Sequence, residues 1–145
     1  MPNLNRYVCS AFALVCTLAS GEEAVVLRDL DAKGRVTLTR DELSQLLPSA
    51  NMSRVSGKGT TNFWKNDPSG TFIISSDNRA TSGQTTTSKG KWHISEDGRY
   101  CVLIEWKRVQ TEEWCRFIVK SGSAHYATKS DRTGTEKVYR LYISP

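Results

Sequence analysis

Two histidines and two neighbouring serines supply the residue types of hydrolase chemistry, but their spacing argues against it. The segment SGSAH at 121–125 holds nucleophile and base types. It lacks the G-x-S-x-G turn that presents a nucleophilic serine after a buried strand. His93 and His125 are expected on separate strands, with no third ligand at zinc spacing. We therefore expect no catalytic residues and no enzyme activity.

The acidic segment DLDAKG at 29–34 begins like a calcium-binding loop. Such loops need oxygen donors at their fifth and twelfth positions, and here Lys33 and Arg40 stand there. Two cations in a cation site oppose binding. We predict no metal site, and no nucleotide or other cofactor motif occurs in the chain.

The four cysteines form two unequal pairs. Cys9 and Cys16 lie in an apolar N-terminal run, whereas Cys101 and Cys115 lie on two apolar segments joined by a polar stretch. Placing Cys101 opposite Cys115 in a hairpin puts both thiols on one face. The CxxC spacing of redox centres is absent. We predict a structural disulfide between Cys101 and Cys115.

That register sets which aromatic residues share a face. Alternation places Tyr100, Val102, Ile104 and Trp106 on the inward face of their strand. Packing of the aromatic side chains into a solid core is the favoured interpretation, and a lined ligand cavity is the alternative. The candidate ligand-lining residues are Trp92, Tyr100, Trp106, Trp114 and Arg116.

Arg116 faces Tyr100 in this register, which leaves two interpretations open. An arginine at an exposed edge, stacked on Tyr100, is favoured. An inward arginine beside Tyr100 and Trp114 would instead anchor a carboxylate or phosphate ligand.

The N-terminal run predicts export. Residues 1–21 carry one basic side chain, an uncharged apolar core and small residues before two glutamates, which is typical of a signal peptide. Lipidation at Cys16 and a buried N-terminal helix are the alternatives. The apolar run is too short to span a bilayer. We expect a periplasmic or extracellular protein with residues 22–145 as one domain.

The net charge of +5 comes from basic residues that are scattered among acids. No basic stripe forms, so no nucleic-acid partner is expected.

The remaining sequence predicts one helix followed by strands. Thr39 and Glu42 fit a capping box, and the leucines after them have helical spacing up to Pro48. Residues 22–38 give no clear prediction, and the polar segment 81–90 is expected to be a loop. Strands are expected at 53–57, 61–65, 70–76, 88–95, 98–107, 112–120, 123–128 and 136–143.

Short strands in regular succession predict a mainly β protein. We expect a small antiparallel β-barrel, a lipocalin-like meander of about eight strands with one short N-terminal α-helix. A β-sandwich is the second choice.

One pattern resembles a known family. Gly90-Lys91-Trp92, then Asp97-Gly98-Arg99-Tyr100-Cys101, then Trp114-Cys115 form a G-x-W…D-G-x-x-C…C pattern after the 39–47 helix. Over residues 39–128 it resembles the bacterial exported proteins grouped as domain of unknown function 995. The resemblance implies a lipocalin-like periplasmic β-domain. That family has no agreed activity, so the resemblance implies no catalytic residues.

The sequence therefore predicts a non-catalytic exported barrel that binds a small apolar or amphiphilic ligand. The alternative is a protein-interaction module, such as an inhibitor of a secreted hydrolase or an envelope accessory factor.

Overall fold

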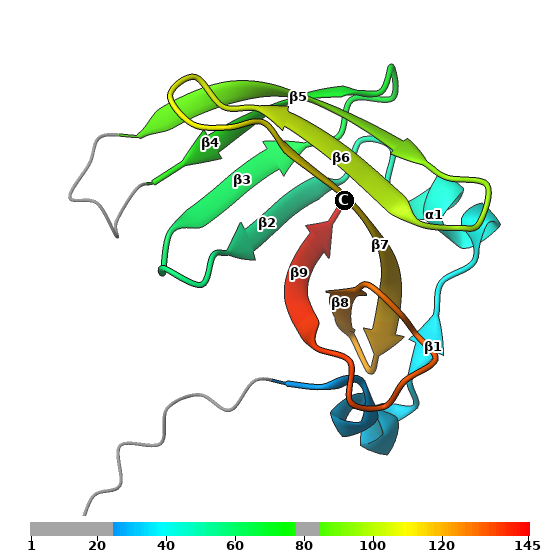
Figure 1. Cartoon of the computed structure of the whole chain (residues 1–145). Coiled ribbons are helices and arrows are strands. Elements are labelled where there is room, and N and C mark those ends of the chain that lie inside the picture. Colours follow the sequence, from blue (N-terminus) through cyan, green and yellow to red (C-terminus); the bar gives the residue numbers. More distant parts are fainter. Residues whose placement is uncertain (1–24, 78–84) are drawn as a thin grey trace, which may run out of the picture.

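Alternating inward apolar and outward polar side chains build a closed antiparallel barrel of eight strands in the computed structural model of this chain (Figure 1). The structure describes residues 25–77 and 85–145. The predicted leader, with Cys9 and Cys16, lies outside the described residues. The predicted barrel is confirmed, and the β-sandwich is excluded.

The barrel is an up-and-down meander in which each strand pairs with the next and β9 returns to β2. Its strands are β2 (Asn51–Val55), β3 (Thr61–Lys65), β4 (Thr71–Ser76), β5 (Thr86–Ile94), β6 (Tyr100–Glu105), β7 (Glu112–Ser121), β8 (Ala124–Thr128) and β9 (Val138–Ser144). All eight predicted strands exist, with bounds shifted by a few residues.

The β6–β7 hairpin has the predicted register. Tyr100 pairs with Arg116, Cys101 with Cys115, and Val102 with Trp114. The two cysteines are bonded in the structure and close a loop with a sequence separation of 14. The predicted disulfide is therefore confirmed.

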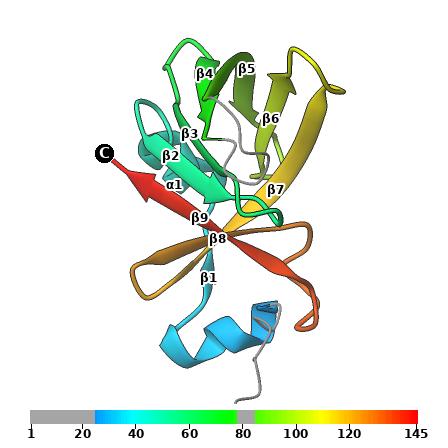
Figure 2. The ribbon, with the colours of Figure 1, turned by 90° about the vertical axis from the view of Figure 1, so that its left-hand side faces the viewer.

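Two short elements between residues 25 and 38 were not predicted. The 3-10 helix η1 (Leu27–Lys33) packs Leu27 and Leu30 against Val119 and Val138, on the outer surface of β7 and β9. Figure 2 shows η1 (blue) below β8 and β9, away from β3–β6. Strand β1 (Val36–Thr37) pairs with the second half of β7. This segment forms a small second core outside the barrel.

Helix α1 (Arg40–Leu46) begins with the predicted capping box. Thr39 Oγ1 accepts a hydrogen bond from the Glu42 amide at 3.2 Å, and the Glu42 carboxylate accepts one from the Thr39 amide at 2.7 Å. The helix buries Leu43 and, at its C-cap, Leu47 in the main core. We call the barrel end that α1 covers the closed end.

A buried hydrogen-bond network ties α1 to the barrel at the closed end. Trp64 Nε1 donates to the Tyr100 hydroxyl at 3.1 Å, and that hydroxyl donates to Asn66 Oδ1 at 2.8 Å. Asn66 Nδ2 in turn donates to the Leu47 carbonyl at 3.2 Å. Each of these three buried polar side chains has a hydrogen-bond partner, so the network adds no unpaired polar group to the apolar closed end.

The predicted loop at 81–90 is wrong for its second half. Thr86–Gly90 belong to β5, which pairs with β4 from Thr86 to Lys91. Gly90 faces inward, and a Cβ there would lie 2.1 Å from the Phe72 ring. The ring therefore occupies the place of the missing side chain, and this packing supports a strand in a polar sequence. Residues 78–84 lie outside the described part.

Within the described residues, neither helix has the length and apolar character needed to cross a membrane.

Candidate functional site

The inward face of the barrel changes character toward the end opposite α1. On β2 the buried Met52 is followed at the next inward position by Arg54. On β7 the inward positions run from Ile118 through Arg116 and Trp114 to Glu112. The interior is thus apolar near α1 and charged near the β2–β3 and β6–β7 turns. We call this second end the open end.

A pocket of about 420 Å³ lies at the open end and is named here the barrel-end pocket. This volume falls within the range of small-molecule sites. Four of its lining residues are cationic and one is acidic. The pocket is lined by Arg54, Val55, Ser56, Gly57, Glu112, Trp114, Arg116, Ala127, Lys129, Tyr139, Arg140 and Leu141.

Glu112 organises one wall of the barrel-end pocket. Arg54 Nη1 lies 2.8 Å from Glu112 Oε1 and Nη2 lies 3.0 Å from Oε2, which is a bidentate ion pair. Trp114 Nε1 donates to Oε1 and Trp106 Nε1 donates to Oε2, each at 3.0 Å. The Arg54 Nε also donates to Asn62 Oδ1 at 3.1 Å. Four donors therefore hold one carboxylate.

The environment of Glu112 keeps this carboxylate ionised. Burial by itself would raise the pKa of Glu112, but the hydrogen bonds and charge of Arg54 and the two indole donors outweigh it. The net result is a pKa below the ordinary value of 4.5. A permanently ionised, fully bonded carboxylate is suited to a structural role rather than to proton transfer.

Arg116 lies inside the barrel, on the same face of β7 as Trp114 and Ile118. Its guanidinium lies over the Trp114 ring at 5.8 Å from the centroid, and Nη1 donates to the Cys115 carbonyl at 2.8 Å. The favoured interpretation, an edge-exposed arginine stacked on Tyr100, is wrong. Trp114 sits one inward position closer to the open end, and the long side chain extends toward that end.

The other predicted lining residues divide between core and pocket wall. Trp92 and Tyr100 are buried in the main core and do not line the barrel-end pocket. Trp106 is half-buried and reaches the site only through its bond to Glu112. Trp114 and Arg116 line the pocket directly. Arg54, Lys129 and Tyr139 were missed, because a single cation or tyrosine on a short strand carries no sequence signal.

The groupings that resemble catalytic or metal sites have structural roles. Asp29 accepts a hydrogen bond from the Val26 amide at the start of η1, and Asp31 forms an ion pair with Arg35 at 2.8 Å. The Ser121 hydroxyl is buried and donates to the Leu30 carbonyl at 2.7 Å. Across residues 25–77 and 85–145, no three His, Cys, Asp or Glu side chains gather in a way that could hold a metal ion.

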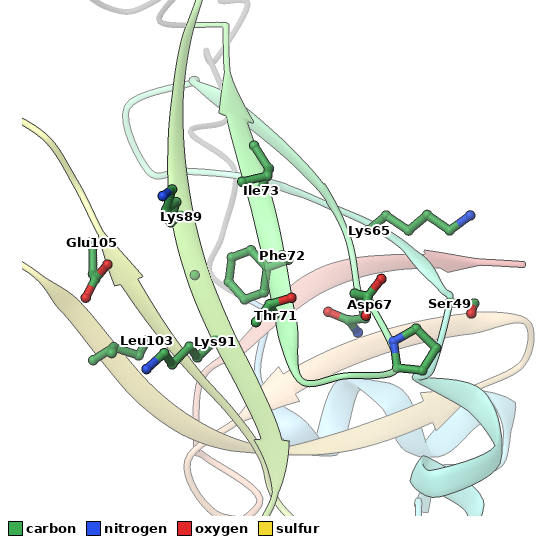
Figure 3. A pocket seen from close by; sticks show the side chains of 13 residues that line it. Ser49, Lys65, Asp67, Thr71, Phe72, Ile73, Lys89, Lys91, Leu103 and Glu105 are labelled. Carbon is green, nitrogen blue, oxygen red and sulfur yellow. The ribbon is translucent and has the colours of Figure 1, made fainter.

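A larger hollow of about 700 Å³ lies on the outside of β3–β6 (Figure 3). Its walls include outward-facing side chains, among them Lys89 and Lys91 on β5 and Leu103 and Glu105 on β6. In Figure 3 the Lys65 side chain points away from these residues. Lys89 and Glu105 are paired across β5 and β6, but Lys65 on β3 is turned away from them, so we prefer the barrel-end pocket as the candidate site.

Neither a scan against protein-family models nor searches of curated proteins and of solved structures find a match to this chain. The likeness to domain of unknown function 995 stays a prediction that rests on its motifs.

Proposed function

We propose that this protein is a non-catalytic binding protein that holds a small amphiphilic molecule in the barrel-end pocket. The single observation that carries the proposal is the pocket itself, whose inner wall is formed by inward-facing side chains such as Arg54, Trp114 and Arg116 beside the packed core. Trp114, Leu141 and Ala127 supply apolar surface, and Arg54 with Arg116 supplies polar groups at the same opening. A few convergent polar groups in an apolar cleft are typical of ligand sites.

We propose that the protein acts after export, in the periplasm or outside the cell. Two features support this proposal. The first 21 residues have signal-peptide character. The Cys101–Cys115 disulfide is typical of oxidising compartments, because cytosolic thiols are kept reduced.

Native mass spectrometry of the protein purified from its own export route tests the binding function. We expect a non-covalent adduct of low mass that Ala127→Phe removes, because Ala127 lines the pocket and a phenyl ring there fills it. His93→Phe is the matched control, since His93 is exposed on β5 and does not line the pocket. An adduct that survives in Ala127→Phe would place the ligand elsewhere and overturn the proposal.

One observation supports the alternative of a protein-interaction module. Phe63 and Tyr142 are 52% and 50% exposed and flank Ser53 on the outer face of neighbouring strands. Exposed aromatic residues on neighbouring strands are typical of protein-binding surfaces. A Phe63→Ser/Tyr142→Ser variant that keeps the adduct but loses a protein partner in the same preparation would favour this alternative.

A further inference from the structure

The charges around the barrel-end pocket do not balance. Among its lining residues, Arg54, Arg116, Lys129 and Arg140 are cationic, and Glu112 is the acid. Each Glu112 oxygen already accepts two hydrogen bonds, from Arg54 and from an indole. The carboxylate has no capacity left for a second cation. The charge of Arg54 is therefore neutralised by Glu112 within the wall, and none of the other three lining cations forms an ion pair among the described residues.

Arg140 is held on the rim of the pocket. Its guanidinium lies over the rings of Tyr126 at 5.3 Å and Tyr142 at 4.8 Å. Tyr126 pairs with Arg140 on β9 and with Val119 on β7. Val119 belongs to the second core outside the barrel, so these side chains occupy outward positions of the sheet. Arg140 thus contributes positive electrostatic potential at the pocket opening rather than a direct contact with a ligand inside the pocket.

Of the three lining cations that Glu112 does not bind, Arg116 is the one at an inward strand position. Within the described residues, its single hydrogen bond runs from Nη1 to the Cys115 carbonyl, and it forms no ion pair. A guanidinium has five N–H donors in a planar fork, so most of its donors remain available. Burial lowers the pKa of Arg116, while Tyr139 and Glu136 act in the opposite direction, and the group stays charged.

The position of Arg116 is fixed on one side by the Trp114 ring. Trp114 itself is fixed by the bond of its Nε1 to Glu112 and by Arg54 over the ring at 5.8 Å. The guanidinium is therefore held in place before any ligand arrives, and the ordering cost on binding is reduced. Lys129, exposed at the end of β8, supplies a second positive charge at the same opening.

We propose that the barrel-end pocket binds a small organic carboxylate. Arg116 binds the carboxylate through its planar fork, Lys129 adds charge, and the apolar body of the ligand lies against Trp114 and Leu141. This inference rests on the proposed function and names the chemical class of its ligand.

Three naphthalene probes of matched size test the inference on the full, disulfide-bridged chain by isothermal titration calorimetry. They are 1-naphthoate, the neutral 1-naphthalenemethanol and the cationic 1-naphthylmethylamine. We expect naphthoate to bind at least about tenfold more tightly than the alcohol, and the amine to bind most weakly. Arg116→Gln should weaken naphthoate about tenfold and leave the alcohol unchanged.

Arg132→Gln is the matched control, because Arg132 is exposed in the β8–β9 loop, does not line the pocket and carries the same charge. It should leave all three affinities unchanged. If Arg116→Gln fails to fold, raising the salt concentration from about 20 mM to about 500 mM tests the same point on the natural chain. Salt should weaken naphthoate and spare the alcohol.

Equal affinities of naphthoate and the alcohol, or an equal loss of both in Arg116→Gln, would overturn the carboxylate assignment. The pocket would then remain a binding site for neutral ligands. Failure of all three probes would also overturn the assignment, whereas only the adduct experiment with Ala127→Phe decides the proposed function itself.

Discussion

The two ends of the barrel are built from the same strands but are stabilised differently. At the closed end, α1 covers an apolar core in which Trp64, Tyr100 and Asn66 satisfy each other's hydrogen bonds. At the open end, Glu112 gathers Arg54 and two indoles, and Arg116 keeps an unbalanced charge beside a pocket. We infer from this contrast that the closed end supplies stability, which allows the open end to keep a charged and unfilled interior.

Leu43→Ala should have the largest effect on stability. Leu43 is fully buried between α1 and the barrel, so truncation leaves a cavity at the closed end. We expect the free energy of unfolding to fall by about 4 kcal/mol, measured by urea denaturation. Val36→Ala, at a 54% exposed position, is the control and should cost well under about 1 kcal/mol. A loss of naphthoate binding in folded Leu43→Ala would contradict the proposal that the closed end supplies stability and the open end supplies binding.

Removal of the disulfide with Cys101→Ala/Cys115→Ala should have the second largest effect on stability. The bridge closes a loop with a sequence separation of 14, for which the chain-entropy model gives about 3 kcal/mol. The register of β6 and β7 is also fixed by their apolar alternation, so the folded variant should keep the barrel-end pocket. Urea denaturation measures the loss, and probe binding below the transition measures the pocket. Unchanged stability would show that the bridge is dispensable.

Tyr100→Phe isolates the polar network of the closed end. It removes one hydroxyl and leaves the Trp64 indole and the Asn66 amide oxygen without their buried partner. We expect a loss of about 2 kcal/mol in the free energy of unfolding. Because the cost comes from unsatisfied neutral groups, it should be constant between acidic and neutral pH. A cost of zero would mean that water replaces the hydroxyl at the closed end.

Sequence patterns predicted the closed end better than the open end. The capping box at Thr39 and Glu42 and the strand alternation are local signals, and they gave α1, the eight strands and the register at Cys101–Cys115. Alternation shows which face a residue occupies, but not how far along the barrel it lies. For that reason Tyr100 in the core and Trp114 at the pocket could not be distinguished.

The organisation of the open end depends on contacts between distant parts of the chain. The Arg54–Glu112 pair joins residues separated by 58 positions, and no local pattern marks either side chain as a partner. The placement of η1 could not be predicted for the same reason. Its Leu27 and Leu30 meet Val119 and Val138 only after the barrel has closed. The segment between residues 25 and 38 is short and mixes polar and apolar residues, so its sequence alone could not predict this packing.

Glu112→Gln should have the smallest effect on stability and the most distinctive pH dependence. The substitution keeps the shape of the side chain but leaves Arg54 without a counterion in a half-buried site. We expect a loss of about 1.5 kcal/mol at neutral pH, less than for a fully buried pair, because water still reaches both groups.

The folded-state pKa of Glu112 is lower than its ordinary value of 4.5, so ionisation of this carboxyl stabilises the fold above that pH. As pH falls through the lowered pKa, the natural chain loses this contribution and Glu112→Gln has none to lose. The difference in free energy of unfolding between the two proteins should therefore shrink in acid, whereas the difference for Tyr100→Phe should not. Urea denaturation at a series of pH values measures both. A Glu112→Gln difference in free energy of unfolding that stayed constant in acid would show that the charge of Glu112 does not stabilise the open end. The open end would then depend on packing, as the closed end does, and the proposed electrostatic difference between the two ends would be wrong.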